Sequence, residues 1–199
     1  MSFFSFVRSQ LLVTLPVPTH DFSNQTIIVT GANTGLGLEA ARYFLKLNAA
    51  RIILAVRTVS KGDAAKAELE ASSHRGPGVL EVHALDMESS ASVEAFAAKM
   101  NTLSRIDVLL LNAGKVTQEF YLAEGNESTI TVNVVNTFLL AFLMLPKLRQ
   151  VASEFAVLPR IVVVSSDRHV ETNLAEWKTD NTFVTLNDPK TAKMHERQV

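Results

Sequence analysis

The sequence has 199 residues, of which 47% are hydrophobic, and a net charge of −1 at pH 7. This length is enough for one domain with a sizeable core, and the apolar content argues against a disordered chain. Basic and acidic residues are dispersed, so no basic surface indicates a nucleic-acid partner. The absence of cysteine excludes disulfides and thiolate metal sites, and we expect no bound metal. A chain without cysteine also fits a reducing compartment such as the cytoplasm.

The first 17 residues are apolar and aromatic, interrupted by Arg8 and Pro16. The uncharged stretches are too short to span a bilayer, and no cleavage site of a signal peptide follows them. One face of a short helix would carry Phe3, Phe4, Phe6, Val7, Leu11 and Leu12. We interpret residues 1–20 as an apolar extension that packs against the body of the protein; contact with a membrane surface or a partner is the less favoured alternative.

A strand, a glycine turn and a helix are predicted over residues 26–48. The β-branched run at 27–29 is typical of a buried parallel strand, and apolar residues at helical spacing follow the turn. Between them lie Gly31, Gly35 and Gly37. A helix N-terminus offers unpaired N–H groups and the positive end of a dipole, and glycines let the backbone approach a ligand closely. The unit predicts a cradle for a dinucleotide pyrophosphate; the alternative is a turn that merely uses glycines.

The rest of the chain continues the same alternation. Further apolar strands are expected at 51–56, 79–85, 106–111 and 160–164, and helices at about 60–72, 89–103 and 127–145, the last ending at Pro146. Repeated strand–helix units with continuous apolar strands predict an α/β fold with a doubly wound parallel sheet covered on both faces. The apolar run at 130–145 is too short to span a membrane and contains Asn133 and Asn136, so we expect a buried helix.

Polar residues follow each predicted strand, and in such a sheet ligands bind outside the carboxyl ends of the strands. Gly31, Arg57, Asp86, Asn112 and the pair Ser165 and Ser166 occupy these positions. Arg57 stands twenty positions after Gly37, where an arginine suits the 2′-phosphate of NADP, and Lys61 adds a second positive charge one helical turn later. The alternative for both is a solvated position at the start of a surface helix.

The remaining candidates are individually ambiguous. Asp86 is a candidate acceptor for an adenine amino group and a candidate cap of the next helix, two roles that are compatible. Asn112 either ties neighbouring strands beside an adenosine ribose or belongs to an ordinary turn. Asn133, in a helix expected to be buried, must bind backbone, water or a catalytic group, because an unpaired amide there costs about 1–3 kcal/mol. Ser166 either polarises a substrate carbonyl or caps its strand, and Ser165 is an alternative donor or a core residue.

These residues together resemble the short-chain dehydrogenase/reductase family over residues 21–199. The motifs that carry the resemblance are Thr30-Gly31-x-x-x-Gly35-x-Gly37, Asp86, Asn112-Ala113-Gly114, Asn133 and Ser165-Ser166. The segment with Trp177 and Leu186-Asn187-Asp188 is similar to a branch with retinol-dehydrogenase-like and fungal secondary-metabolite reductases. The resemblance implies a Rossmann-like domain with NADP as cofactor and a ketone or alcohol as substrate. It implies cofactor contacts from Gly31, Asn33, Gly35, Leu36, Gly37 and Gly114, a proton relay through Asn133 and carbonyl polarisation by Ser166.

The sequence departs from the family at the catalytic acid/base, which is a tyrosine followed four residues later by a lysine. This chain has only Tyr43 and Tyr121, followed at that spacing by Leu47 and Gly125. A phenol near its reference pKa of about 10 is a poor base at neutral pH. We do not expect another side chain to take over the role of the missing tyrosine; the candidates are His169, Lys190, Lys193 and His195. We expect a truncated domain with severely impaired hydride transfer; the alternative is a non-catalytic NADP-binding or interaction protein of the same descent.

One expectation concerns the sheet itself. In the complete family fold a sixth strand covers strand 160–164, and without it this strand becomes a sheet edge. An exposed apolar edge invites pairing with another chain. We therefore expect poor solubility or a homodimer.

Overall fold

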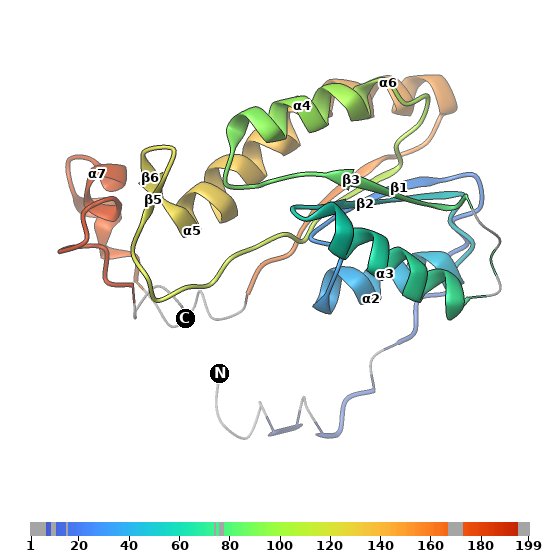
Figure 1. Ribbon diagram of the computed structural model, residues 1–199, viewed down its shortest axis with the longest axis horizontal. Coiled ribbons are helices and arrows are strands. Elements are labelled where there is room, and N and C mark those ends of the chain that lie inside the picture. Colours follow the sequence, from blue (N-terminus) through green and yellow to red (C-terminus); the bar gives the residue numbers. More distant parts are fainter. Residues whose placement is uncertain are drawn as a thin grey trace.

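The computed structural model describes residues 7–8, 11–14, 16–73, 75, 78–166 and 173–194. Its centre is a parallel sheet with the strand order β3–β2–β1–β4–β7 (Figure 1). The strands are β1 (Thr26–Thr30), β2 (Arg51–Val56), β3 (Leu80–Ala84), β4 (Val108–Leu111) and β7 (Arg160–Val163). The order reverses direction between β1 and β4, as in a doubly wound α/β fold, which confirms the predicted fold class.

Helices cover the two faces of the sheet. Helices α2 (Gly35–Lys46) and α3 (Val59–Ala71) lie on one face, and α4 (Ser90–Asn101) and α6 (Thr137–Phe155) on the other (Figure 1). Successive β1 side chains enter different cores, because strand side chains alternate between faces. Ile28 packs in the cluster with α4 and α6, whereas Ile27 and Val29 pack in the cluster with α2. The β-branched run is therefore buried on both sides.

The long apolar helix does not end at Pro146 as expected. It begins with α5 (Ser128–Ile130), continues through a π-helical turn η1 (Thr131–Asn136) and runs as α6 to Phe155, with Pro146 inside. Proline removes the bond to the carbonyl of Phe142, a residue on the exposed side of the helix. Met144 and Leu148 anchor the helix in the core on either side of the proline. Tertiary packing thus outweighs the local preference for a helix end.

The same helix corrects the expectation about its length. The continuous stretch Ser128–Phe155 has 28 residues and by length and composition alone could cross a membrane. Buried helices of soluble proteins pass the same test, and this helix lies against α4 and contributes Leu140 and Met144 to the core. Its place in the fold is that of the predicted core helix.

Strand β7 lies at the edge of the sheet and pairs within the described residues with β4 alone, which confirms the expected edge. Val162, Val163 and Val164 are 42–43% exposed. At the other end of the chain, Leu11 and Leu12 are more than three quarters exposed, so the expected packing of the N-terminal extension against the body is wrong for these residues. Residues 1–6, which include the three phenylalanines of the proposed face, lie outside the described residues.

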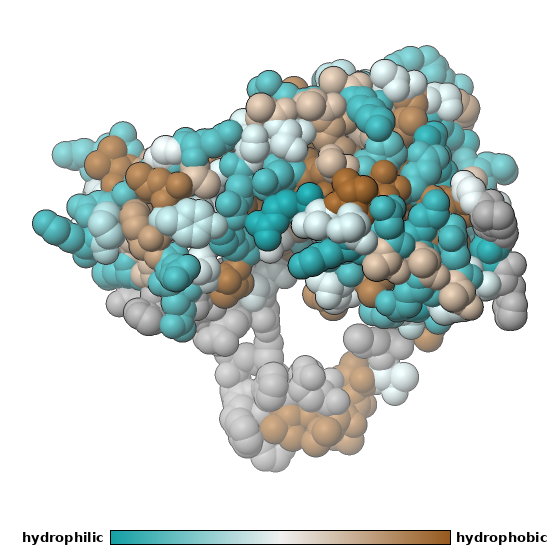
Figure 2. All heavy atoms as spheres, viewed as in Figure 1, coloured by the Kyte–Doolittle hydropathy of each residue, from teal (hydrophilic) through white to brown (hydrophobic). Residues whose placement is uncertain are grey.

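Three small elements lie near the N-terminal end of the long helix, where α5 begins. They are the antiparallel hairpin β5 (Leu122–Ala123) and β6 (Asn126–Glu127), the 3₁₀ turn η3 (Ala175–Lys178) and the short helix α7 (Thr182–Leu186). Asn187, directly after α7, joins this helix to the hairpin: its Oδ1 accepts from the backbone N–H of Glu127 at 2.7 Å, and its Nδ2 donates to Asn126 Oδ1 at 2.9 Å. Exposed apolar side chains, among them Phe183 and Val184, gather at this end (Figure 2).

Candidate functional site

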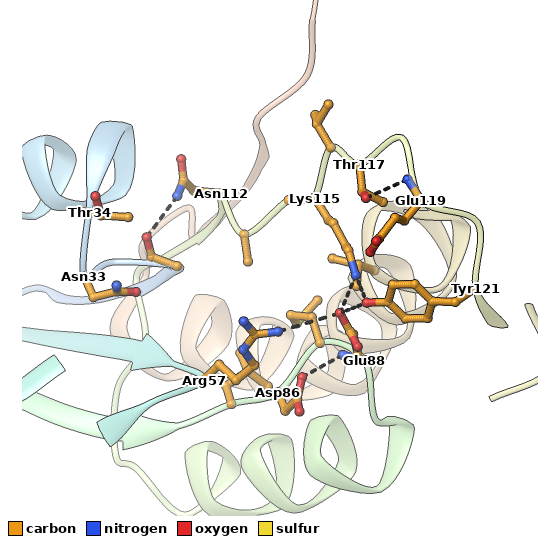
Figure 3. A pocket seen from close by; sticks show the side chains of 17 residues that line it. Asn33, Thr34, Arg57, Asp86, Glu88, Asn112, Lys115, Thr117, Glu119 and Tyr121 are labelled. Carbon is orange, nitrogen blue, oxygen red and sulfur yellow. Dashed lines mark hydrogen bonds and ion pairs between the residues drawn. The ribbon is translucent and has the colours of Figure 1, made fainter. Parts of the chain in front are cut away.

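A cavity of about 700 Å³ opens at the carboxyl ends of the strands, where the strand order reverses between β1 and β4 (Figure 3). Its lining comes from the ends of β1, β2, β3 and β4 and from the segment after β4. The lining residues are Gly31, Asn33, Thr34, Arg57, Leu85, Asp86, Met87, Glu88, Asn112, Ala113, Gly114, Lys115, Val116, Thr117, Glu119, Tyr121 and Val132. Of the five strand ends predicted to form the site, four line this one cavity, and the fifth, which carries Ser165 and Ser166, does not.

The glycine turn is built for close approach. A Cβ added to Gly37 would lie 2.4 Å from the carbonyl oxygen of Gly31 and 2.5 Å from Asn112 Nδ2, so a larger residue cannot fit there. Gly31 and Gly35 have φ values of +65° and +56°, a conformation that glycine adopts without cost. A Cβ at Gly35 would meet nothing within 4 Å, which leaves open space beside the turn. These glycines are required by geometry.

Helix α2 begins directly at this turn. Thr34 at its N-cap makes no side-chain capping hydrogen bond, and no acidic residue lies in the first turn. The N-terminal N–H groups of a helix need partners, and the helix dipole favours a negatively charged one. The cradle therefore offers N–H groups and a positive dipole end beside open space.

Asn112 fastens the end of β4 to the end of β1. Its Nδ2 donates to the carbonyl oxygens of Thr30 and Gly31 at 3.0 and 3.4 Å. The Thr30 hydroxyl accepts from the backbone N–H groups of Asn112 and Ala113 at 3.0 and 2.9 Å. Of the two interpretations of Asn112, the tie between neighbouring strands is the one observed, and it holds the floor of the cavity.

Asp86 lies in the cavity wall after β3. Its Oδ1 accepts from the backbone N–H of Glu88 at 2.9 Å, and its own N–H donates to Ser92 Oγ at 2.9 Å. The cap of helix α4 is Ser89, whose hydroxyl accepts from the N–H of Ser92. Asp86 thus orders the turn before α4 and lines the cavity, but it is not the helix cap, so the capping role considered for it is wrong.

Arg57 faces the cavity in a cluster with Glu88, Lys115 and Tyr121 (Figure 3). Lys115 Nζ lies 2.7 Å from Glu88 Oε1, and the Tyr121 hydroxyl donates to the same oxygen at 2.8 Å. Lys115 Nζ also contacts the Tyr121 hydroxyl directly. Arg57 Nη1 is 3.7 Å from Glu88 Oε1, and its side chain is 69% exposed. Lys61, in the first turn of α3, does not line the cavity.

Asn133 was expected to be buried in the helix, but the buried asparagine is Asn136. Asn133 is exposed, and its amide is bonded on both sides to the backbone of Lys115: Oδ1 accepts from the N–H and Nδ2 donates to the carbonyl, each at 2.8 Å. Asn136 is fully buried; its Nδ2 donates to the Met87 carbonyl at 2.9 Å and its Oδ1 accepts from Ser90 Oγ. The π-helical turn changes which side chains face inward, so a regular helical period misplaces them.

The other predicted residues lie around the cavity. Ser165 and Ser166 follow β7 and are exposed, so Ser165 is not a core residue, and neither lines the cavity. Leu36 in the first turn of α2 is also exposed. Gly114 lines the cavity and lies beside Asn133. Lys190 and Lys193 are exposed and do not line it, and His169 and His195 lie outside the described residues.

Sequence reasoning missed Glu88, Lys115 and Tyr121. Lys115 follows Asn-Ala-Gly directly, and Glu88 follows Asp86 by two positions, so proximity to two recognised motifs was an available signal. The position of Tyr121 had no such signal, because the segment between β4 and β5 has no periodic pattern.

Comparison with known proteins defines the class. The model of the short chain dehydrogenase family matches residues 25–175. The chain is 53% identical over 197 residues to the short-chain dehydrogenase anuD of Penicillium roqueforti, covering 99% of this chain and 51% of the relative. It is 44% identical over 198 residues to the short chain dehydrogenase atnD of Emericella nidulans, covering 98% and 63%. The chain therefore belongs to the short-chain dehydrogenase family and spans about half to two thirds of the length of these relatives.

Solved structures agree with this assignment. A metagenomic short-chain oxidoreductase in complex with NADP matches with a TM-score of 0.60 and 31% identity, covering 73% of this chain and 62% of that one. A short-chain dehydrogenase from Escherichia coli CFT073 complexed with NADPH matches with a TM-score of 0.62 and 24% identity, covering 78% and 65%. The second likeness supports the fold alone. The predicted family and Rossmann-like fold are confirmed.

Proposed function

We propose that this chain binds NADP in the cavity between β1 and β4. We further propose that it is an NADP-dependent reductase or dehydrogenase that acts on a ketone or alcohol in fungal secondary metabolism. The observation that carries this proposal is the glycine turn at the start of α2, where Gly37 packs too closely against Gly31 and Asn112 for a Cβ while Gly35 borders open space. The structure with NADP that this chain resembles at 31% identity supports the choice of cofactor, and the fungal relatives support the branch.

The residues present fit the parts of NADP. The uncapped N-terminus of α2, with the open space at Gly35 and the neighbouring Asn33 and Leu36, suits a pyrophosphate. We assign Arg57, which lines the cavity, to the 2′-phosphate, and Lys61, in the first turn of α3 and outside the lining, as a second positive charge. Asp86, Asn112 and Gly114 would border the adenosine.

When bound, a nicotinamide cofactor supplies or accepts the hydride of the reaction. Among the residues of this chain, we assign Ser166 to hydrogen-bonding the substrate oxygen, with Ser165 as the adjacent hydroxyl. Asn133 would position the backbone of Lys115, because its amide holds both backbone polar groups of that residue. Its part in a proton relay rests on the family resemblance alone.

A second candidate is a non-catalytic NADP-binding or interaction protein. The observation in its favour is that neither Tyr43 nor Tyr121 has a lysine four residues later. The enzyme and the non-catalytic NADP-binding protein both require NADP binding and differ in turnover, whereas an interaction protein requires neither. NADPH consumption by the purified chain with a panel of ketones separates them.

The cofactor site is tested by fluorescence titration of NADPH into the wild type, Gly35→Asp and Gly35→Asn. Asp and Asn have the same shape and both tolerate a positive φ, so the backbone strain is matched and only the charge differs. We expect Gly35→Asp to weaken NADPH binding about tenfold or more relative to Gly35→Asn, through repulsion of the pyrophosphate. Equal affinities of the two variants, or no binding by the wild type, would contradict the proposal.

Two further features belong to the proposal. Self-association into a homodimer is supported by the uncovered edge of β7. The cytoplasm is the proposed compartment, in keeping with the absence of cysteine.

A further inference from the structure

Three hydrogen-bond donors converge on one oxygen atom of Glu88. Lys115 Nζ and the Tyr121 hydroxyl lie 2.7 and 2.8 Å from Oε1, and Arg57 Nη1 lies 3.7 Å from it (Figure 3). The first two distances are those of hydrogen bonds, whereas the third is a loose ion pair. Glu88 is therefore satisfied mainly by Lys115 and Tyr121.

The two cations differ in how firmly they are held. The Lys115 side chain is 21% exposed, its backbone is fixed on both sides by Asn133, and its Nζ also lies 4.0 Å from the centre of the Tyr121 ring. Arg57 is 69% exposed at the cavity rim. A guanidinium in this position can turn either toward Glu88 or toward a phosphate in the cavity. The strength of its attraction to Glu88 decides how readily it is available for the phosphate.

We propose that Lys115 sets the selectivity for NADP over NAD by neutralising Glu88 and so leaving Arg57 free for the 2′-phosphate. This inference rests on the proposed NADP site. Lys115 acts here as a positioning residue for Arg57. Tyr121 assists it by donating to the same carboxylate oxygen, and Glu88 is the competing anion.

The proposal predicts opposite effects from the two charges. Without Lys115, Glu88 attracts Arg57 more strongly and repels a 2′-phosphate, so NADPH binding weakens. Without the Glu88 charge, Arg57 is released and NADPH binding strengthens. NADH carries no 2′-phosphate and responds less to either change. Because the groups are partly exposed, each effect is modest.

The test is a double-mutant cycle on Lys115→Met and Glu88→Gln, with dissociation constants for NADPH and NADH measured by fluorescence on the full chain. Lys115→Met should raise the dissociation constant of NADPH about fivefold and that of NADH less than about twofold. Glu88→Gln should lower the dissociation constant of NADPH about threefold. In the Glu88→Gln background, Lys115→Met should change NADPH affinity by less than about twofold. Tyr121→Phe should act as Lys115→Met does, but more weakly. Lys99→Met, an exposed lysine on α4, is the matched control and should change neither constant.

Each outcome has a distinct meaning. An equal loss of NADPH affinity from Lys115→Met with and without Glu88 would show that the lysine acts on the nucleotide directly, which overturns the inference while the NADP site stands. An equal loss for NADPH and NADH would overturn it in the same way. If the wild type binds neither nucleotide, or binds NADH as well as NADPH, the proposed NADP site fails first, and the inference fails with it.

Discussion

The two edge strands of the central sheet, β3 and β7, differ in their residue pattern and in how they are protected from solvent. On β3, apolar residues alternate with Glu81 and His83, Leu80 is buried, and Val82 packs beneath helix α3. On β7, the valines of the edge remain about two fifths exposed. Charged side chains and a covering helix are the usual protections of a sheet edge. The comparison shows that a strand pattern predicts pairing into a sheet, while protection depends on what packs beside the strand.

The largest difference between the edges should appear in stability. Leu80→Ala on β3 should lower the free energy of unfolding by about 2–4 kcal/mol, because a buried side chain leaves a cavity. Val163→Ala on β7 should cost less than about 1 kcal/mol, because much of that side chain is already solvated. Urea denaturation followed by circular dichroism measures both. A cost for Val163→Ala as large as that for Leu80→Ala would mean that β7 is covered in solution.

An intermediate effect is expected on self-association. Val162→Lys places a charge on the β7 edge and should weaken association between chains about tenfold, since a buried lysine would lose its hydration. Ala84→Lys, at the exposed end of β3, is the control and should leave association unchanged. Sedimentation velocity over a range of concentrations gives the association constants. A wild-type chain that is monomeric and unfolds cooperatively at every concentration would contradict the role assigned to the β7 edge.

The smallest effect concerns the charges that protect β3. Hydrogen bonds from Arg51, and secondarily from His83, lower the pKa of Glu81 below its ordinary value of 4.5. A lowered pKa in the folded state stabilises the fold above the ordinary value, and this contribution is lost as the pH falls through the folded pKa. Glu81→Gln should therefore lower the free energy of unfolding by less than about 1 kcal/mol at pH 7, because the Arg51–Glu81 pair is partly exposed. At a pH below the folded pKa of Glu81 the substitution should leave the free energy of unfolding unchanged.

Unfolding titrations at pH 7 and at the lowest pH at which the chain stays folded test this dependence. Glu94→Gln on α4 provides an exposed carboxylate as control. A cost for Glu81→Gln that is the same at both pH values would show that the side chain acts through packing and not through its charge.

Much of the fold could be predicted from the sequence alone. The inner strands β1, β2 and β4 appeared as short apolar runs, because strands buried on both faces need apolar residues at nearly every position. The edge strand β3 departs from the predicted continuous run, since Glu81 and His83 alternate with its apolar residues. The glycine turn was recognisable because the geometry at Gly31 and Gly37 excludes a Cβ. Arg57, Asp86 and Asn112 could be recognised as candidates because each follows a predicted strand, and the carboxyl ends of parallel strands lie on the same side of the sheet.

Other features depended on contacts between segments distant in sequence. Pro146 lies inside a helix because the core holds both sides of it, and a π-helical turn, not the regular period, places Asn136 in the core and Asn133 at the surface. The cluster of Glu88, Lys115 and Tyr121 joins a turn after β3 to the segment after β4. Local sequence determined the secondary structure and the glycine cradle, since these follow from backbone sterics and apolar burial. Only the tertiary structure decided which charges meet, because an ion pair depends on distances that no local pattern specifies.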